Sequence, residues 1–211
     1  MQSSHPSSEY SVYTFNRVSK QEIDWNQNSP DTANKINQLE FSKFVGVTNL
    51  YDSSIEAMQS LKNRKNRKRI VLIVTDGLDT NSKYKDSDLK KLSYELLSPI
   101  CIINVGVVKI NRAKDLAGGT LDMLAERTMS EIASGTGGLA VLPQTREGVT
   151  DSFKRIAAFV KYQYLIGINT ASIAKDNKQH KLQVKVNQPP DAPKELKNLK
   201  IIYPQFWVTK K

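Results

Sequence analysis

Two polar residues occupy positions where an α/β protein would hold a ligand. Asp76 follows an apolar run, residues 70–74, with Thr75 between them, and precedes Gly77. Open α/β sheets bind their ligands at the carboxyl ends of the strands, so the Asp76 carboxylate can point into the crevice above the sheet. Thr48 lies earlier, in a loop that enters a helix, and we expect its hydroxyl beside the same crevice. The two residues together predict a binding site.

The cysteine, histidine and aspartate residues do not support a disulfide framework, a zinc or histidine metal site, or an enzymatic reaction. The chain has one cysteine and two histidines, which excludes a disulfide framework and a cysteine-based zinc cluster. His5 and His180 lie far apart and neither accompanies a Ser or Cys motif, so a histidine metal site and nucleophilic catalysis are unsupported. Cys101 lies inside an apolar run, which predicts a buried, unreactive thiol. A phosphatase of the haloacid dehalogenase type needs Asp-x-Asp, whereas Asp79 lies one position too far from Asp76.

A strongly basic run, residues 62–69, begins with Lys62, ends with Arg69 and carries six positive charges. The whole chain has 31 basic and 21 acidic residues, a net charge of +10, which favours acidic partners or surfaces. Such a run can bind phosphates. However, cations are favourable at any helix C-terminus, and no aromatic residues interleave with the run for base stacking. A basic nucleic-acid or anionic-surface binding module centred on this run is the leading alternative function.

Alternating apolar and helical patterns predict the elements that would position these residues. With 211 residues, 39% of them hydrophobic, the chain can bury a sizeable core. Three segments are apolar on both faces and predict buried parallel strands: residues 69–75, 100–105 and 139–142. Helices are predicted over residues 86–96, 121–132 and 145–162. Leu124 and Phe153 are expected on the inward faces of the last two. The alternation predicts an α/β fold with a doubly wound, mostly parallel sheet.

The two ends of the chain carry other patterns. Upstream, two strands and two helices are predicted over residues 10–18, 22–25, 31–39 and 50–61. Downstream of Tyr162, apolar segments separated by polar loops predict three strands, residues 164–169, 181–186 and 199–208. These three strands predict a small antiparallel β unit at the C-terminus.

Five segments, in this order, resemble the bacterial von Willebrand factor A-related proteins, which combine that domain with a C-terminal β extension. They are residues 48–55, 62–69, 70–77, 134–138 and 162–167. The resemblance covers nearly the whole chain from Tyr10 onward. It implies a Rossmann-type fold that binds Mg²⁺ or Mn²⁺ at a metal-ion-dependent adhesion site. Such a site recognises an acidic residue of another protein and performs no covalent chemistry.

The resemblance also implies roles for individual residues. Thr48 and Asp76 would be metal ligands, and we assign the neighbouring Asn49 and Asp79 to partner binding. These ligands suit Mg²⁺, a hard octahedral ion that keeps several waters and leaves one coordination position for the partner's carboxylate.

The sequence departs from the family pattern at its front. The family's first loop, Asp-x-Ser-x-Ser, supplies most of the metal ligands and is absent from this chain. The strand before that loop would precede Met1, which predicts a truncated chain whose sheet lacks its first central strand. That strand would lie between those at Tyr10 and Ile70, and its loss would leave a gap of about 10 Å. With only Thr48 and Asp76 left, we expect metal binding to be weak or absent.

These observations predict a truncated von Willebrand factor A-like domain over residues 1–161 and a C-terminal β extension over residues 162–211. The predicted function is non-enzymatic protein recognition or adhesion through an acidic residue of the partner. No apolar run approaches the roughly 20 residues that cross a bilayer. The sequence does not predict the compartment, because a signal peptide would have been lost with the front end. Export of the parent protein to the periplasm or the cell exterior is one option.

Overall fold

The computed structural model describes most of the chain: residues 7–27, 30–39, 46–106, 116–173, 175–187, 193 and 200–209. Contacts between Cα atoms divide the chain into two compact units. The first comprises Met1–Ser60 and Leu78–Lys85, and the second comprises Leu61–Gly77 and Asp86–Lys211. The boundary expected between residues 161 and 162 is a different division of the chain and stays a prediction.

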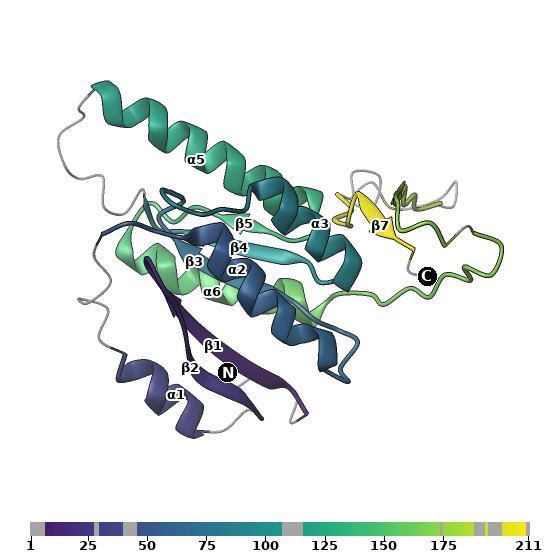
Figure 1. The fold of residues 1–211 in the computed structure, drawn as a ribbon, viewed down its shortest axis with the longest axis horizontal. Helices are drawn as coiled ribbons and strands as arrows, with labels where there is room; N and C mark the ends of the chain where they lie inside the picture. The colour runs from purple at the N-terminus through teal and green to yellow at the C-terminus, as the bar shows by residue number, and fades with distance from the viewer. Residues whose placement is uncertain are drawn as a thin grey trace. The chain divides into compact units, whose positions relative to one another are not determined.

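The first unit contains a β-hairpin and two helices (Figure 1). Strands β1 (Glu9–Phe15) and β2 (Ser19–Gln27) pair antiparallel, and they are followed by α1 (Pro30–Asn37) and α2 (Leu50–Gln59). All four elements were predicted from the sequence. The hairpin and α2 pack together through apolar side chains, since α2 contacts both strands. The buried members of this small core are Ile23, Leu50, Ile55 and Met58.

The second unit is built on a parallel three-stranded sheet, which confirms the predicted α/β fold. Its strands are β3 (Val71–Thr75), β4 (Ile100–Asn104) and β5 (Ala140–Val141), in the order β3-β4-β5. The short 3₁₀-helix η2 (Ser60–Asn63) precedes β3. The helices of this unit are α3 (Asp86–Leu96), α5 (Leu116–Gly135) and α6 (Arg146–Lys161). Strand and helix alternate in this unit. Each helical crossover returns the chain to the same end of the sheet, so the next strand runs parallel to the one before it.

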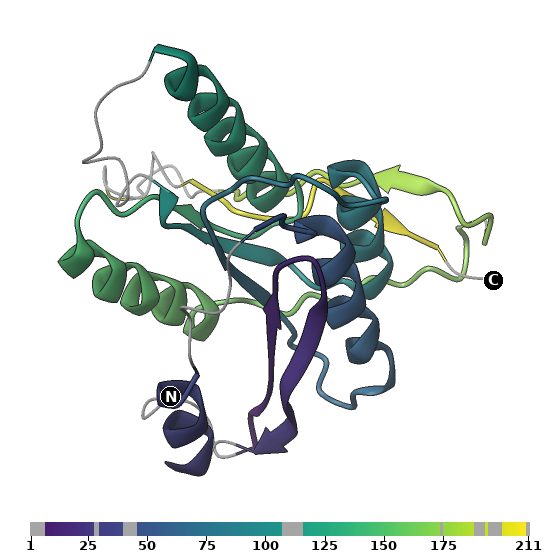
Figure 2. The ribbon, with the colours of Figure 1, turned by 60° about the vertical axis from the view of Figure 1, so that its left-hand side comes forward.

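The middle strand, β4, is buried on both faces. All five of its residues are buried, and α5 and α6 both pack against it. Figures 1 and 2 show these two helices on opposite sides of the sheet. On the α6 side, Cys101 and Ile103 form a cluster with Val141 and Ile156. Burial raises the pKa of the Cys101 thiol to about 11, which keeps it protonated at neutral pH, as expected for an unreactive cysteine.

One strand departs from its predicted burial on both faces. In β3, Ile73 and Thr75 are buried, but Leu72 is 36% exposed and Val74 is 41% exposed. Both exposed side chains lie on the same face as Cys101, because Leu72 pairs directly with Cys101 in the parallel register. Helix α6 packs against β4 but much less against β3. Among the described elements, α6 therefore does not cover this face of β3.

Two helices turn slightly different faces to the sheet than the apolar pattern predicted. Leu124 of α5 is 60% exposed, whereas Ala125 and Met129 are buried. Phe153 of α6 is 44% exposed, whereas Ser152 is buried and donates a hydrogen bond to a backbone carbonyl of its own helix. Small residues allow a helix to approach a sheet closely, so they can take the inner face from larger apolar residues.

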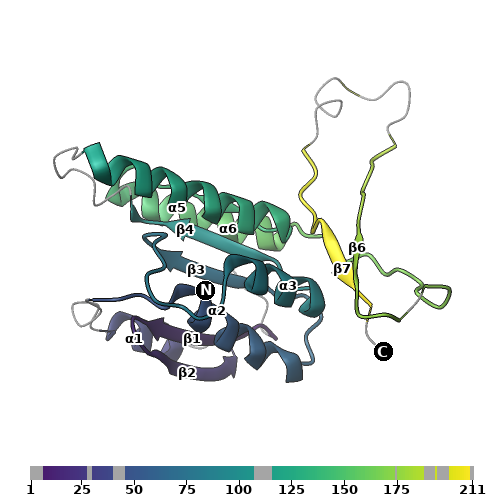
Figure 3. The same ribbon diagram turned by 45° about the horizontal axis from the view of Figure 1, so that its top comes forward.

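The C-terminal part is less regular than predicted. It contains a short antiparallel pair, β6 (Gln179–Lys181) and β7 (Phe206–Val208), which Figure 3 shows side by side. Residues 164–169, predicted as a strand, have no regular secondary structure, and β6 covers only the start of the predicted segment 181–186. Residue 199 and most of the polar loop before it lie outside the described residues. A strand needs a hydrogen-bonded neighbour, and residues 164–169 have none among the described residues.

A polar cluster holds β6 to the end of β7. His180 Nε2 lies 3.3 Å from Asp176 Oδ1 and 3.2 Å from Thr209 Oγ1, and Thr209 Oγ1 donates to Asp176 Oδ1 at 3.2 Å. The ring of Trp207 lies 5.4 Å from that of His180. A hydrogen bond from the Lys178 amide, with smaller contributions from Thr209 and His180, lowers the pKa of the Asp176 carboxyl. The ionised carboxylate therefore stabilises the strand pair.

Acid is expected to open this strand pair. A lowered folded-state pKa means that the stabilisation from Asp176 is present above the ordinary carboxyl pKa and is lost as the pH falls through the folded value. Protection of the β6 and β7 amides from hydrogen exchange should therefore be constant at neutral pH and fall below about pH 4. In Asp176→Asn the protection should be lower at neutral pH and lack this acid step. An unchanged acid profile in the variant would assign the opening to another group.

Candidate functional site

The loop that carries Thr48 is fixed to a second loop of the first unit. The Thr48 amide donates to Thr80 Oγ1 at 2.7 Å, and the Thr80 amide donates back to the Thr48 carbonyl at 2.9 Å. Thr48 itself is half-buried, and its hydroxyl makes no hydrogen bond within the described part of the chain. The backbone is therefore held in place while the hydroxyl is available for a ligand.

Asn49, predicted to contact a partner, is engaged within the protein. Its Nδ2 donates to the Arg17 carbonyl at 2.8 Å, and its Oδ1 accepts from Asn81 Nδ2 at 2.9 Å. Its amide donates to the Asn16 carbonyl at 2.8 Å. These bonds tie the β1–β2 turn and the loop after Asp79 to the start of α2. Partner binding by Asn49 stays a prediction.

Asp79, also assigned to partner binding, caps α2 from a distance. Its Oδ1 accepts from the Leu50 amide at 2.8 Å, more weakly from the Tyr51 amide at 3.4 Å, and from Ser82 Oγ at 2.6 Å. The first amides of a helix have no partner within the helix, and a carboxylate there also interacts favourably with the helix dipole. The residue in the N-cap position, Asn49, makes no side-chain capping bond. Asp79 supplies that cap instead.

The capping is reciprocal. Ser82 Oγ accepts from the Tyr51 and Asp52 amides at 3.1 Å each, and Asp52 Oδ1 accepts from the Lys83 amide at 2.9 Å and the Tyr84 amide at 3.0 Å. Helix α2 and the loop after Asp79 therefore fix one another. Sequence reasoning missed this pairing, because no local capping pattern joins residues that are about thirty positions apart.

Asp76 lies where the sequence predicted, at the carboxyl end of β3 in the second unit. The turn that follows is tight: Gly77 has φ +88°, and its amide donates to Thr75 Oγ1 at 3.1 Å. The neighbouring strand ends at the same level, since the Val105 amide donates to the Thr75 carbonyl at 2.7 Å. A Cβ on Gly106 would lie 2.7 Å from the Asp76 carbonyl oxygen. The backbone of Asp76 is thus locked to the end of β4.

The available donors are few for a divalent cation. Thr48 and Asp76 belong to different units, so their joint site stays a prediction. In the described ranges, no group of three His, Cys, Asp or Glu side chains is arranged to hold a metal. One hydroxyl and one carboxylate are suitable oxygen ligands for Mg²⁺ or Mn²⁺, but they are fewer than a tight site uses. A weak cation site at these two residues, completed by water and a partner's carboxylate, therefore stays a prediction.

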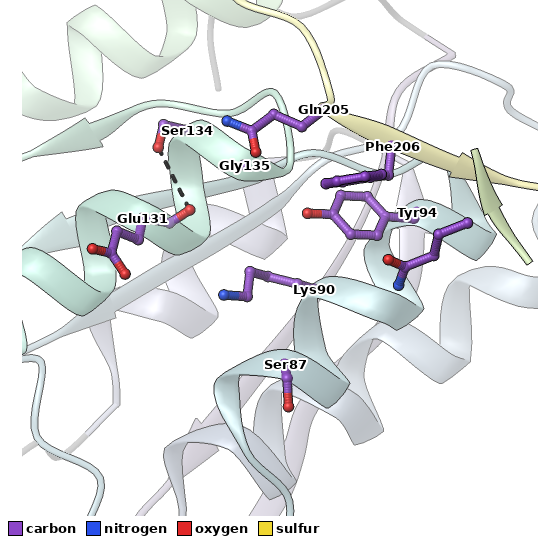
Figure 4. A pocket seen from close by; sticks show the side chains of 9 residues that line it. Ser87, Lys90, Tyr94, Glu131, Ser134, Gly135, Gln205 and Phe206 are labelled. Atoms are coloured by element: carbon purple, nitrogen blue, oxygen red, sulfur yellow. Dashed lines mark hydrogen bonds between the residues drawn. The ribbon is translucent and has the colours of Figure 1, made fainter. Parts of the chain in front are cut away.

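A shallow pocket of about 420 Å³ lies elsewhere in the second unit (Figure 4). Its lining comes from α3, α5, β6 and the start of β7: Ser87, Lys90, Tyr94, Glu131, Ser134, Gly135, Gln179, Gln205 and Phe206. Lys90 pairs with Asp86 at 2.8 Å and Glu131 pairs with Arg127 at 2.8 Å. Burial raises the pKa of Tyr94, whose ring lies 5.5 Å from that of Phe206. The pocket follows from the packing of residues 205 and 206 on the helices, and no pattern in the sequence indicated it.

Residues 1–78 match the family model of the von Willebrand factor type A domain. This match supports a von Willebrand factor A-related domain in the chain. The matched range ends two residues after Asp76 and includes Thr48, so both predicted ligands lie inside the von Willebrand factor A match. Domains of this type are general protein-interaction domains, and they are generally not enzymes.

Two of the solved structures that are similar to this chain differ in how well they superpose, and one of them has a TM-score above 0.5. The conserved hypothetical protein BatB from Bacteroides thetaiotaomicron is similar with a TM-score of 0.52 and 11% identity, over 74% of this chain and 80% of that one. An uncharacterized membrane spanning protein from Vibrio fischeri reaches a TM-score of 0.35 and 13% identity, over 72% and 76%. No curated protein matches the sequence. The BatB likeness supports the fold alone.

None of the helices in the described ranges is long and apolar enough to cross a membrane.

Proposed function

We propose that this von Willebrand factor A-related chain is a non-enzymatic protein-recognition or adhesion module of a bacterial protein, which takes an acidic side chain of its partner. The observation that carries the proposal is the family match over residues 1–78, because that range contains both residues to which the resemblance gives a ligand role. The position of Asp76 at the carboxyl end of β3 supports it, since ligands of open α/β sheets bind at that end.

In this proposal Thr48 and Asp76 are the ligands of an incomplete metal-ion-dependent adhesion site. Bound Mg²⁺ or Mn²⁺ would supply an open coordination position for the partner's carboxylate. The Thr48 hydroxyl has no competing partner among the described residues, so it can bind without breaking a hydrogen bond. Because only two protein ligands are available, the dissociation constant for the cation alone should be about 1 mM or weaker.

Asn49 and Asp79 have a supporting part in the proposed site. Both side chains hold the Thr48 loop through bonds to Asn81 and to the Leu50 amide. A partner that approaches Thr48 would meet this half-buried polar rim first. Their assignment to partner binding is therefore proposed together with a role in holding the loop.

Calorimetric titration of the full chain tests the proposal. Mg²⁺ should give a weak binding heat, and a peptide that bears a carboxylate side chain should bind only when Mg²⁺ or Mn²⁺ is present. Thr48→Val removes the hydroxyl oxygen and Asp76→Asn removes the negative charge of the carboxylate, both at nearly constant volume, so both should abolish the cation-dependent heat. Asp151→Asn removes a highly exposed carboxylate that pairs with Lys154 and serves as the matched control.

Two results would contradict the proposal. One is peptide binding that is the same with and without the cation. The other is cation and peptide binding that persist unchanged in both Thr48→Val and Asp76→Asn. A dissociation constant for Mg²⁺ far below the millimolar range would contradict the incompleteness of the site.

A further inference from the structure

The basic run, residues 62–69, begins at the end of η2 and continues as a largely exposed loop toward β3. Its last residue fastens it: Arg69 Nε donates to the Asn66 carbonyl at 2.6 Å, and the Arg69 guanidinium also bonds the Arg64 carbonyl. With the backbone held in this way, four cationic side chains remain exposed: Lys62, Lys65, Arg67 and Lys68. None of these four forms an ion pair with another described residue. Their charges are therefore available to an outside partner.

A second unusual feature is the apolar segment, residues 162–168, which leaves the end of α6. Large apolar side chains usually cluster out of water, and contiguous exposed patches mark interaction sites. Here they face solvent over a whole segment without regular secondary structure. The exposed fractions are 73% for Tyr162, 93% for Tyr164, 70% for Leu165, 69% for Ile166 and 53% for Ile168. The sequence pattern predicts a strand over residues 164–169, but no described strand pairs with this segment.

The two features meet at the C-terminus of α6, within the same unit. Lys68 Nζ donates to the Lys161 carbonyl at 3.4 Å, so the basic loop reaches the residue directly before the apolar segment. The Lys161 ammonium also lies 5.7 Å from the centroid of the Tyr162 ring. Figure 3 shows the chain continuing from α6 toward β6 through this segment. The basic loop therefore lies beside the point where the exposed apolar segment begins.

We propose that this surface, the basic loop together with the apolar segment, docks on an anionic lipid bilayer. Anionic headgroups attract a cluster of lysine and arginine side chains at short range. Tyrosine is favoured at the membrane–water interface, and leucine and isoleucine can enter the acyl boundary. Neither signal alone anchors a protein stably, whereas two together do.

The aliphatic side chains favour a bilayer over nucleic acid. Phosphates of nucleic acid would satisfy the cations, and tyrosine can stack on bases, but Leu165, Ile166 and Ile168 have no role in either contact. A bilayer uses all three kinds of side chain at once. This inference goes beyond the proposed protein recognition and uses none of the residues assigned to it.

Sedimentation of the full chain with vesicles tests the inference. Binding to vesicles of phosphatidylcholine mixed with phosphatidylserine should be at least about tenfold tighter than to vesicles of phosphatidylcholine alone, and salt should weaken it. Lys65→Glu/Arg67→Glu should reduce binding to the anionic vesicles at least about tenfold. Arg17→Glu/Lys91→Glu makes the same change of charge at exposed positions outside the basic loop and should reduce it less than about threefold.

The apolar half of the surface has its own variant. Leu165→Ser/Ile166→Ser should weaken binding to anionic vesicles about tenfold while leaving the salt dependence in place. Far-ultraviolet circular dichroism checks that each variant keeps the fold, which is expected because all the changed side chains are exposed.

Three outcomes would overturn the inference. Equal affinity for vesicles with and without phosphatidylserine would show that the charge of the basic loop does not contribute to binding. Tight binding to random-sequence nucleic acid that depends on Lys65 and Arg67 but not on Leu165 and Ile166, without vesicle binding, makes the loop a nucleic-acid module. A concentration-dependent dimer that Leu165→Ser/Ile166→Ser abolishes, again without vesicle binding, makes the apolar segment a strand for a second copy of the chain.

Discussion

Gly138→Ala is expected to lower the free energy of unfolding by about 3 kcal/mol. Gly138 lies between the end of α5 and the start of β5, two residues before Ala140. A Cβ at this position would lie 2.0 Å from the Ile100 carbonyl oxygen and 2.5 Å from the Ile100 carbonyl carbon. Real Cβ atoms do not approach backbone that closely, so one of the two segments must move. Ile100 is fully buried in the central strand, so the displacement would disturb the core of the second unit.

Urea denaturation measures this effect, with Gly167→Ala as the matched control. Gly167 has no atom within 4 Å of its would-be Cβ and has no positive φ, so the same substitution there should change stability by less than about 0.5 kcal/mol. If both variants unfold at the same urea concentration, the result contradicts the prediction that a Cβ at Gly138 clashes with the Ile100 backbone.

Asp79→Ala is expected to lower the free energy of unfolding by about 2 kcal/mol, the upper end of helix-cap effects. The carboxylate accepts hydrogen bonds from the Leu50 and Tyr51 amides and from both the amide and hydroxyl of Ser82. Alanine leaves the Leu50 amide without its acceptor, while the Tyr51 amide keeps Ser82 Oγ, and Leu50 is buried, so water replaces the carboxylate poorly. The loss should be largest at the start of α2, where exchange of the first helix amides with solvent should accelerate.

Two further variants separate capping from general charge effects. Asp79→Asn keeps an oxygen acceptor and should recover about half of the lost stability, because asparagine also caps helices well. Asp151→Ala removes an exposed carboxylate whose pair with Lys154 is 69–73% exposed, and it should change stability by less than about 0.5 kcal/mol. If Asp79→Ala and Asp151→Ala lower the free energy of unfolding equally, the result contradicts a capping role for Asp79.

The parallel core could be predicted because its strands are apolar on both faces. β4 is the clearest case: every residue is buried, so its run of apolar residues has no polar alternation to confuse it with a surface strand. The same logic placed Asp76 correctly at the end of β3, and the family match agrees with the predicted fold. The exposure of Leu72 and Val74 was not predictable, because it depends on how far α6 extends over the sheet.

The loop chemistry around Thr48 could not be predicted in detail. Partner binding by Asp79 stays a prediction, and no pattern in the sequence indicated that its carboxylate caps a helix that precedes it in the chain. Hydrogen bonds of this kind depend on tertiary contacts, whereas capping patterns in sequence are local. The C-terminal strand predictions were wrong only in part: β7 lies within the predicted segment 199–208, whereas β6 overlaps the predicted segment 181–186 at Lys181 alone and residues 164–169 form no strand. The alternating segment after Lys181 has the right residue types, but a strand is defined by its neighbour and not by its own composition.

The turn after α5 is joined to a segment far along the chain. The Gln205 amide donates to the Gly135 carbonyl at 2.9 Å, and Thr136 forms an antiparallel bridge with Pro204. During synthesis, therefore, a ribosome must add every residue from 136 to 205 before this corner of the molecule can close. Contacts of such long range form late and slowly. A nascent chain would display the Tyr94 ring to chaperones until Phe206 emerges and packs against it.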